Sequence, residues 1–286
     1  MAGSGSRHPG NVPGRWFVDD RCIDCDAARQ LAPDLIHRVD GTSVVVRQPA
    51  GPEEEVVMWR AAIACPTRSV RTDPPTPRPR GVFPQHLAAG MTYLGHNSPA
   101  SFGANAFLIE RPAGNLMVDS PRFTPELVSA IDERGGLAAI LLTHRDDVAD
   151  ADRYAERFGA RVWIHEADAP AAPFASDVAV GLDPVEVAPG CSLVPVPGHT
   201  RGSVVFAVDD RFLFTGDSLY WSRRRGDLGV HVRQTWYSLD VQLDSLERLA
   251  ATTPFSYVLA GHGDRHETTV TDMRTRLLAL VARLRS

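Results

Sequence analysis

The chain has 286 residues, of which 43% are hydrophobic and 23% charged, and its formal net charge is −5. This length is enough for one large domain and one small domain, and the composition is ordinary for a soluble globular protein. A mildly acidic chain gives no reason to expect binding to nucleic acid or to a membrane. No apolar run reaches about 18 residues, so no transmembrane helix is expected.

The first 14 residues are mostly small or polar and lack the apolar core of a signal peptide. Residues 1–14 are therefore predicted to form a disordered tail. A cytoplasmic location follows as the default expectation.

Three of the four cysteines lie within residues 15–71. Cys22 and Cys25 form a C-x-x-C pair, and Cys65 is followed by proline near the end of the segment. This arrangement resembles single-cluster bacterial ferredoxins, in which thiolates at such spacings bind an iron–sulfur cluster. The resemblance implies a small ferredoxin-like α+β domain, a cluster held by Cys22, Cys25 and Cys65, and a redox partner.

One ligand position departs from the ferredoxin pattern, because Ala28 stands where the third cysteine is expected. The remaining thiolates suit a three-iron cluster, or a four-iron cluster with an oxygen ligand from Asp24 or Asp26. They also suit a structural zinc ion completed by one further ligand. Alternatively, the domain is a relic that has lost its cluster and keeps its cysteines as small buried residues.

Residues 72–86 contain five prolines. Such a segment is stiff and extended, and we interpret it as the linker to a second domain at residues 87–286. The second domain is predicted to contain a strand at 91–94, a hairpin formed by 104–110 and 115–119, and helices at 125–134, 239–251 and 270–284.

Four apolar, β-rich runs in the second domain each end at a residue that can bind a metal. The run 138–142 precedes His144, and later runs precede His199, Asp217 and His262. Ligands of layered α/β proteins bind at the carboxyl ends of strands. Imidazole and carboxylate are the ligand set for zinc or non-haem iron.

The order Thr-His, Pro-Gly-His-Thr-x-Gly-Ser, Thr-Gly-Asp and Gly-His is similar to that of the metallo-β-lactamase superfamily, whose glyoxalase II-like members are hydrolases. The similarity extends over residues 90–286. It implies two mixed sheets with helices on both outer faces and a metal site along one edge. The predicted fold class is therefore α+β/α/β: a metallo-β-lactamase αββα sandwich preceded by the small ferredoxin-like domain.

The resemblance also implies one metal site with ligands His144, His199 and Asp217. The superfamily's first motif is normally His-x-His-x-Asp-His, and Asp146 stands here at the second histidine position. Asp146 is expected to add an oxygen ligand to this site.

The second metal site is expected to be incomplete. A longer form of the motif, His-Arg-Asp-Asp-Val-Ala-Asp-His, matches through Asp150, but its last histidine is replaced by Ala151. Asp150 and His262 alone would bind a second ion weakly. We therefore expect one strongly bound ion, zinc or iron, with Asp146 or Asp150 as the catalytic proton acceptor.

Two further stretches are weaker candidates for contact with a small-molecule substrate. Arg223, Arg224 and Arg225 follow the Asp217 motif and are either a solvated loop or a patch that binds an anionic substrate. His96 is interpreted as a loop residue at the rim of the site.

Three functions are compatible with these residues. The first is a metal-dependent hydrolase of an ester, thioester or lactone. The second is a mononuclear non-haem iron oxygenase or redox enzyme, similar to the persulfide dioxygenases, with the ferredoxin-like domain as electron relay. The third is a degenerate, non-catalytic binding protein, which the replaced ligand positions Ala28 and Ala151 favour.

Overall fold

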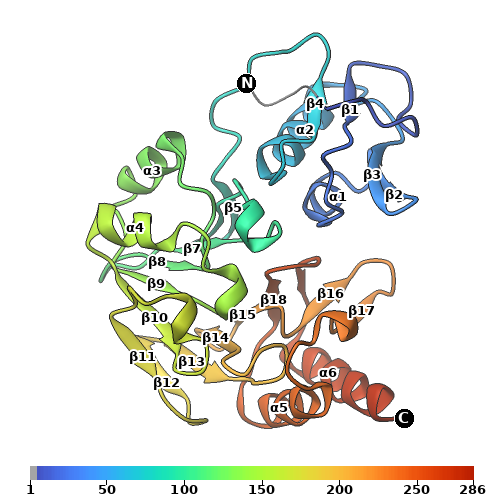
Figure 1. Cartoon of the computed structure of the whole chain (residues 1–286). Coiled ribbons are helices and arrows are strands. Elements are labelled where there is room, and N and C mark those ends of the chain that lie inside the picture. The colour runs from blue at the N-terminus through green and yellow to red at the C-terminus, as the bar shows by residue number, and fades with distance from the viewer. Residues whose placement is uncertain (1–4) are drawn as a thin grey trace.

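Two mixed β-sheets lie face to face in the larger part of the molecule, as the computed structural model of residues 5–286 shows (Figure 1). The strand order is β11-β10-β9-β8-β7-β6-β5 in the first sheet and β12-β13-β14-β15-β18-β19 in the second. The first sheet contains β5 (Gln85–Ala88), β6 (Met91–Tyr93), β7 (Phe107–Ile109), β8 (Leu116–Val118), β9 (Ala139–Leu141), β10 (Arg161–His165) and β11 (Asp177–Ala179). The second contains β12 (Val185–Ala188), β13 (Cys191–Pro195), β14 (Val204–Val208), β15 (Phe212–Gly216), β18 (Tyr257–Ala260) and β19 (His266–Glu267).

The inner faces of the two sheets share one apolar core. It includes Phe107 and Leu141 from the first sheet and Phe206 and Phe214 from the second. The rings of Phe107 and Phe214 meet across the sandwich with centroids 5.4 Å apart. Because helices also cover the outer faces, most strand residues are buried on both sides, and the strands read in the sequence as continuous apolar runs.

Helices cover both outer faces of the sandwich. Leu127 of α3 and Tyr154 of α4 join one apolar cluster with residues of the first sheet. Leu246 of α5 and Leu277 of α6 join another with residues of the second sheet. The four layers give the αββα order that the sequence predicts. These helices are α3 (Pro125–Asp132), α4 (Ala151–Phe158), α5 (Leu239–Thr252) and α6 (Val270–Arg285).

Short elements complete the large domain. A hairpin of β16 and β17 follows β15, and several loops contain a single turn of 3-10 helix. Their bounds are β16 (Tyr220–Ser222), β17 (Asp227–Gly229), η1 (Pro99–Ser101), η2 (Arg145–Asp147), η3 (Ala169–Ala171) and η4 (Val232–Gln234). None of the helices in the described part of the chain has the length and apolar character needed to cross a membrane.

A smaller α+β domain precedes the sandwich and lies above it in Figure 1. Its strands pair antiparallel as β1 with β4 and β2 with β3. Trp16 and Met58 are fully buried in its core. Its elements are β1 (Trp16–Val18), α1 (Ala27–Leu31), β2 (Ile36–Val39), β3 (Thr42–Val45), α2 (Pro52–Ala64) and β4 (Val70–Thr72).

The start of the chain differs from the expected disordered tail. Residues 1–4 lie outside the described residues, but residues 5–14 lie against the small domain. The backbone N–H of His8 donates to the carbonyl of Val18 at 3.0 Å, and that of Val12 donates to the carbonyl of Val45 at 2.9 Å. The Asn11 side chain also bonds the backbone of Val18 and Val45. These bonds depend on strand edges from later in the sequence, which the composition of the first residues does not reveal.

The two domains share a packed interface. Ile63 and Ala64, at the end of α2, belong to the apolar core of the sandwich. On another part of the interface, the turn after η1 brings Gly103 against the small domain, where a Cβ atom at position 103 would lie 3.0 Å from Cys25 Sγ. The proline-rich linker therefore joins two bodies that also contact each other directly.

Replacing Gly103 by Ala should weaken this interface. The new Cβ would press on Cys25 and Pro66, and overpacking of this kind costs about 1–3 kcal/mol. Gly135→Ala is the matched control, because Gly135 has φ 95 against φ 93 at Gly103, yet a Cβ there meets nothing within 4 Å. Urea denaturation should show a larger loss of unfolding free energy in Gly103→Ala. Equal losses in the two variants would mean that the Gly103 contact does not restrain the domains.

Candidate metal centre

Four loops at one edge of the sandwich bring the predicted ligands together. His144 follows β9, and His199 lies in the loop between β13 and β14. Asp217 directly follows β15, and His262 lies just beyond β18. Because β9, β15 and β18 end at the same edge of the molecule, residues more than a hundred positions apart in the sequence become neighbours.

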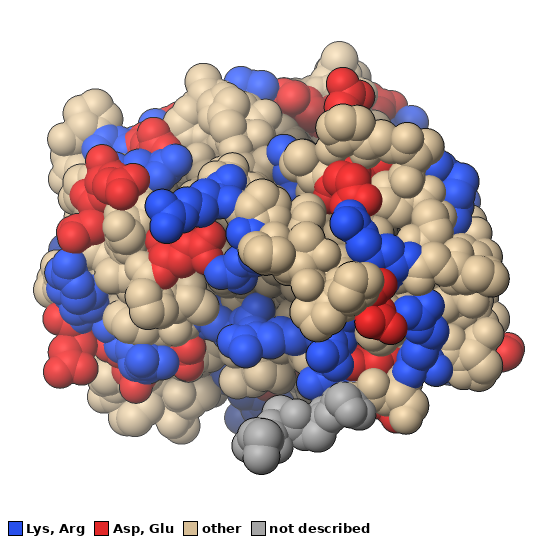
Figure 2. All heavy atoms as spheres, turned by 90° about the horizontal axis from the view of Figure 1, so that it is seen from above, with Lys and Arg blue, Asp and Glu red and all other residues tan. Residues whose placement is uncertain are grey.

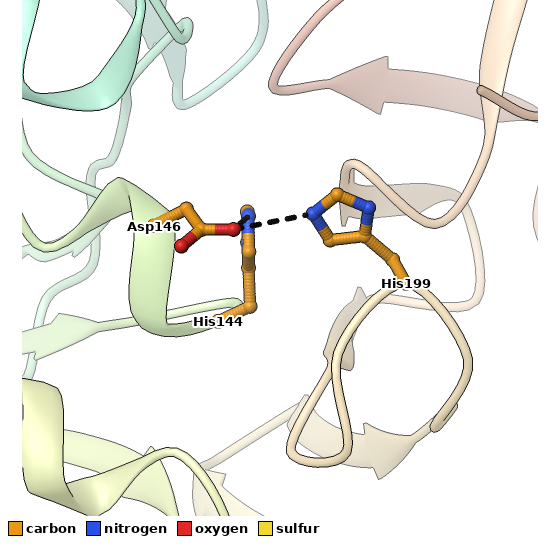
Figure 3. A group of neighbouring side chains, drawn as sticks. All are labelled: His144, Asp146 and His199. Atoms are coloured by element: carbon orange, nitrogen blue, oxygen red, sulfur yellow. Dashed lines mark ion pairs between the residues drawn. The ribbon is translucent and has the colours of Figure 1, made fainter. Parts of the chain in front are cut away.

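The first cluster consists of His144, Asp146 and His199. Figure 3 shows Asp146 reaching from the turn after β9 toward His199, with His144 between them. An Asp146 carboxylate oxygen lies 3.6 Å from His199 Nε2 and 3.9 Å from His144 Nε2. One donor atom from each residue lies within 4.8 Å of the others. This spacing is suited to a single ion held between them.

The second cluster consists of Asp147, Asp217 and His262, whose donor atoms also lie within 4.8 Å of one another. Asp217 links the two clusters. One of its oxygens is 2.8 Å from His262 Nδ1, and the other is 3.9 Å from His144 Nε2 and 3.8 Å from His199 Nε2. A carboxylate in this position can bind two ions at once.

Several donor atoms of the clusters are buried without partners. His144 Nε2, His199 Nε2 and both carboxylate oxygens of Asp147 make no hydrogen bond within the described residues. Buried polar groups without partners cost free energy and are rare in folded proteins. A bound cation would satisfy all of them, so the residues present fit a metal centre.

The carboxyl groups of the site repel one another. Burial raises the pKa of Asp147 well above its usual value, and the charges of Asp217 and Asp119 add to this effect. Burial also raises the pKa of Asp119 to about 8, although hydrogen bonds from Thr143 act to lower it. Burial alone would raise the pKa of Asp217 as well, but His262 and His144 outweigh it and hold that pKa well below its usual value. A divalent cation would relieve the repulsion.

His144 has the protonation state that a metal ligand needs. Burial lowers the pKa of His144 to about 4, so its imidazole is neutral near pH 7 and can bind a metal through a nitrogen lone pair. Thr143 supports this ring, because its hydroxyl lies 3.0 Å from His144 Nδ1 and also donates to the Asp119 carboxyl. Contacts of this kind fix the orientation of a ligating ring.

A cavity of about 720 Å³ opens in front of the two clusters. Its wall includes two half-exposed aromatic side chains, Phe102 and Trp236. The small domain supplies another part of the wall, through Asp24, Cys25 and Arg38. The cavity is therefore shared between the domains, and its size is suited to a small organic molecule.

Several residues that the sequence analysis singled out lie away from this cavity. The Asp150 carboxylate accepts a hydrogen bond from the backbone N–H of Phe123 at 2.7 Å. His96 is buried at a different cavity between the domains. Arg223 is ion-paired to Asp264. Arg224 and Arg225 are likewise absent from the residues that line the metal cavity in the described chain.

Asp147 is the residue of the site to which the sequence analysis assigned no role. It lies three positions after His144 in the 3-10 turn η2. Residues three apart in a 3-10 helix lie on the same face, so His144 and Asp147 both face the metal site. A predicted 3-10 turn after β9 would have revealed it, but neighbouring carboxylates in a polar loop do not indicate which of them points inward.

The cysteines of the small domain have features of cluster ligands. The backbone N–H of Ser43 donates to Cys22 Sγ at 3.5 Å, and that of Ser69 donates to Cys65 Sγ at 3.2 Å. Asp24 and Asp26, next to Cys25, have left-handed backbones with φ of 59 and 72. Such turns direct backbone N–H groups toward a bound anion and are common around iron–sulfur clusters.

Neither aspartate offered as a fourth cluster ligand has a free carboxylate. Asp24 is ion-paired to Arg29 at 2.8 Å and to Arg38 at 2.6 Å, and Asp26 is ion-paired to Arg29 at 2.5 Å. Ala28, at the position of the missing cysteine, packs in the apolar core of the small domain. The protein therefore offers three thiolates to a cluster, and both aspartate carboxylates are engaged by arginine.

Comparison with known proteins gives two family matches. The family described as "Metallo-beta-lactamase superfamily" matches residues 91–284, and that described as "4Fe-4S single cluster domain of Ferredoxin I" matches residues 18–72. Both agree with the domains described above.

Curated relatives and solved structures are similar to the larger domain. A hydroxyacylglutathione hydrolase of Acidiphilium cryptum (strain JF-5) is 29% identical over 161 residues, which are 55% of this chain and 63% of the relative. One of Xanthomonas oryzae pv. oryzae (strain MAFF 311018) is 32% identical over 151 residues, 51% and 55% of the two chains. The chain thus spans less than two thirds of the length of these relatives. The crystal structure of DIM-1 metallo-beta-lactamase has a TM-score of 0.54 at 14% identity, over 70% of this chain and 96% of that chain, and shows the shared fold.

Replacing Thr143 by Val should loosen the metal centre without changing its ligands. The variant loses the hydroxyl that bonds the Asp119 carboxyl and contacts the His144 ring. Loss of such a support lowers metal affinity about tenfold to a hundredfold. Competition with a chromophoric chelator would measure the affinity. Thr92→Val is the control, because Thr92 is also a buried threonine but lies in strand β6, outside the metal site. Unchanged affinity in Thr143→Val would mean that the hydroxyl does not orient the ligand.

Proposed function

Because the chain belongs to the metallo-β-lactamase superfamily, we propose that it is a hydrolase that uses two metal ions to cleave a thioester, ester or lactone. One observation carries the proposal: two donor clusters share Asp217, and several of their buried nitrogen and oxygen atoms have no partner among the described residues. Zinc and iron both accept this mixture of imidazole and carboxylate ligands.

We assign the first cluster to one ion and the second cluster to the other, with Asp217 between them. Asp147 then takes the place that the sequence pattern left to Asp150. The second site has three protein ligands instead of two, and two bound ions replace the single strong ion expected from the sequence. The proposal allows either zinc or iron, and metal analysis of the purified protein distinguishes them.

Metal ions held there would supply a hydroxide nucleophile near neutral pH and polarise the carbonyl of the substrate. The side chains around them position the reaction. Asp146 is 44% exposed to the cavity side of the cluster and lines the cavity, so it is placed to accept a proton. Phe102 and Trp236 offer apolar surface to an acyl group.

A thioester is the first substrate class to test. The curated relatives described above carry the name hydroxyacylglutathione hydrolase, and that name describes thioester cleavage. This chain is similar to only part of the length of these relatives, so the thiol leaving group of its substrate must be identified by the assay. An ester or lactone presents the same carbonyl chemistry to the two clusters.

A redox function is the second candidate, and the position of Cys25 favours it. Cys25 lines the same cavity as His262, and the His262 ring faces the carbonyl of Phe102 at 3.4 Å, next to Gly103. An iron–sulfur cluster on Cys22, Cys25 and Cys65 would thus lie beside the metal centre. If iron occupies the centre, the cluster could pass electrons to it, as in the oxygenase-type alternative.

Replacing Asp147 by Asn should lower the metal content from two ions per chain to one. The substitution keeps the shape of the side chain but removes the charge that the second ion needs. Asp150→Asn is the matched control, because its carboxylate bonds the Phe123 backbone and should leave both ions bound. Elemental analysis after dialysis measures the content. If Asp150→Asn loses an ion and Asp147→Asn keeps both, the assignment of the second site is wrong.

Zinc-loaded protein should cleave a thioester without oxygen, and His199→Ala should lose this activity together with the ion of the first cluster. Free thiol released from acyl-glutathione and acyl-coenzyme A substrates measures the rate under nitrogen. Turnover that requires Fe(II) and oxygen would instead support the redox candidate. Absence of turnover with either metal across thioesters, esters and lactones would support the non-catalytic alternative.

A further inference from the structure

A second cavity lies between the two domains, apart from the metal centre. Its volume is about 550 Å³, within the range of ligand sites in proteins. Four arginines line it: Arg68 and Arg71 from the small domain, Arg78 from the linker and Arg122 from the large domain. Figure 2 shows basic side chains gathered around a hollow on the face seen from above, where the linker lies in Figure 1.

The positive charge of this arginine cavity is only partly balanced. Glu126 is the one carboxylate among its lining residues in the described chain, and it is paired to Arg78. Arg71 lies 3.4 Å from Asp19, but Asp19 is already bonded more closely, at 2.6 Å, by Arg21. The Arg68 guanidinium has no hydrogen-bond or ion-pair partner within residues 5–286.

Arg122 is half-buried, and it has no acidic partner within hydrogen-bond distance. Its guanidinium donates to backbone carbonyls of Ile63 at 3.1 Å, His96 at 3.4 Å and Cys65 at 3.5 Å. Burial lowers its pKa, and the charges of Arg68 and Arg78 lower it further. A half-buried charge that faces other charges of the same sign is unfavourable for the folded protein unless a counter-ion binds.

The remaining walls of the arginine cavity are apolar or neutral. Trp59, Ile63 and Val70 form its apolar side. Burial and the nearby arginines lower the pKa of His96 to about 3, so its ring is a neutral hydrogen-bonding group. An occupant therefore needs at least two negative charges for the arginines and can place a flat or apolar group against Trp59.

We propose that this cavity binds an organic diphosphate or polyphosphate, such as the phosphate chain of a nucleotide, which bridges the two domains. Guanidinium groups bind phosphate oxygens in pairs, with a fixed fork geometry that suits linked phosphates. Such a ligand contacts the small domain through Arg68 and Arg71, the linker through Arg78 and the large domain through Arg122. Its binding stabilises the contact between the domains, and it is independent of the chemistry at the metal centre.

Calorimetric titration of the full chain with inorganic pyrophosphate and with ADP tests the proposal. We expect both to bind, and Arg68→Gln to weaken them about tenfold to a hundredfold, the effect of losing charge-assisted hydrogen bonds. Arg80→Gln is the matched control, since Arg80 lies on the same linker but does not line the cavity. ADP that binds more tightly than pyrophosphate and quenches tryptophan fluorescence supports a nucleotide; equal affinities support recognition of the phosphate chain alone.

Pyrophosphate also binds metal ions, so the titration is repeated on His199→Ala from which a chelator has removed any ion still held by the second cluster. Retained affinity in this variant places the ligand away from the metal centre. The proposal is overturned if neither probe binds at millimolar concentration, if Arg80→Gln weakens binding as much as Arg68→Gln, or if His199→Ala abolishes it. Thermal denaturation with and without pyrophosphate adds a folding readout, in which the wild type should be stabilised and Arg68→Gln should not.

Discussion

The arrangement of the larger domain depends on buried negative charge at the edge of the sandwich. Asp119, Asp147 and Asp217 converge there, and the first two have raised pKa values because burial and mutual repulsion disfavour their charged forms. A protein cannot bury several carboxylates together at low cost unless cations or protons compensate them. Histidines that follow β9, β13 and β18 supply part of the compensation, and the unpaired donor atoms leave the rest to metal ions.

This constraint explains why the site lies where it does. Each ligand lies just beyond a strand, where the backbone can turn and the side chain can point along the edge instead of into the apolar core. The inner faces of the two sheets share one continuous apolar cluster. The rigid sandwich therefore holds the donor atoms at fixed separations, and the loops supply the side chains that can bind metal.

The small domain is part of this arrangement and not merely attached to it. Its Cys22–Cys25 turn forms one wall of the metal cavity, and the end of α2 extends the core of the sandwich. Between these two contacts, arginines from both domains and the linker enclose a second cavity. A change in the small domain, such as binding or loss of a cluster at its cysteines, would therefore act directly on the wall of the metal cavity.

The sequence by itself determined the family, the layered fold and most of the ligand types. The apolar runs that end in His144, His199, Asp217 and His262 are recognisable because burial on both faces requires unbroken apolar strands and metal binding requires imidazole or carboxylate. The helices at 239–251 and 270–284 were predictable because their apolar positions recur at helical spacing, and the helix at 125–134 because Thr124 can cap its start. The resemblance to ferredoxins in the small domain likewise depends on cysteine spacing, which is a local property.

Only the tertiary structure decided which carboxylates face the site and what the domains share. Asp147 and Asp150 are equivalent in a linear pattern, but the 3-10 turn directs Asp147 inward, while Asp150 bonds the backbone of Phe123. His96 lies away from the expected rim of the metal site, because the direction of a loop side chain depends on what packs against the loop. Arg223 is exposed, as in the solvated-loop alternative. The arginine cavity is lined by residues 68, 71, 78 and 122, which come from separate parts of the chain. A local sequence pattern cannot predict this grouping, because the grouping arises from the packing of the two domains.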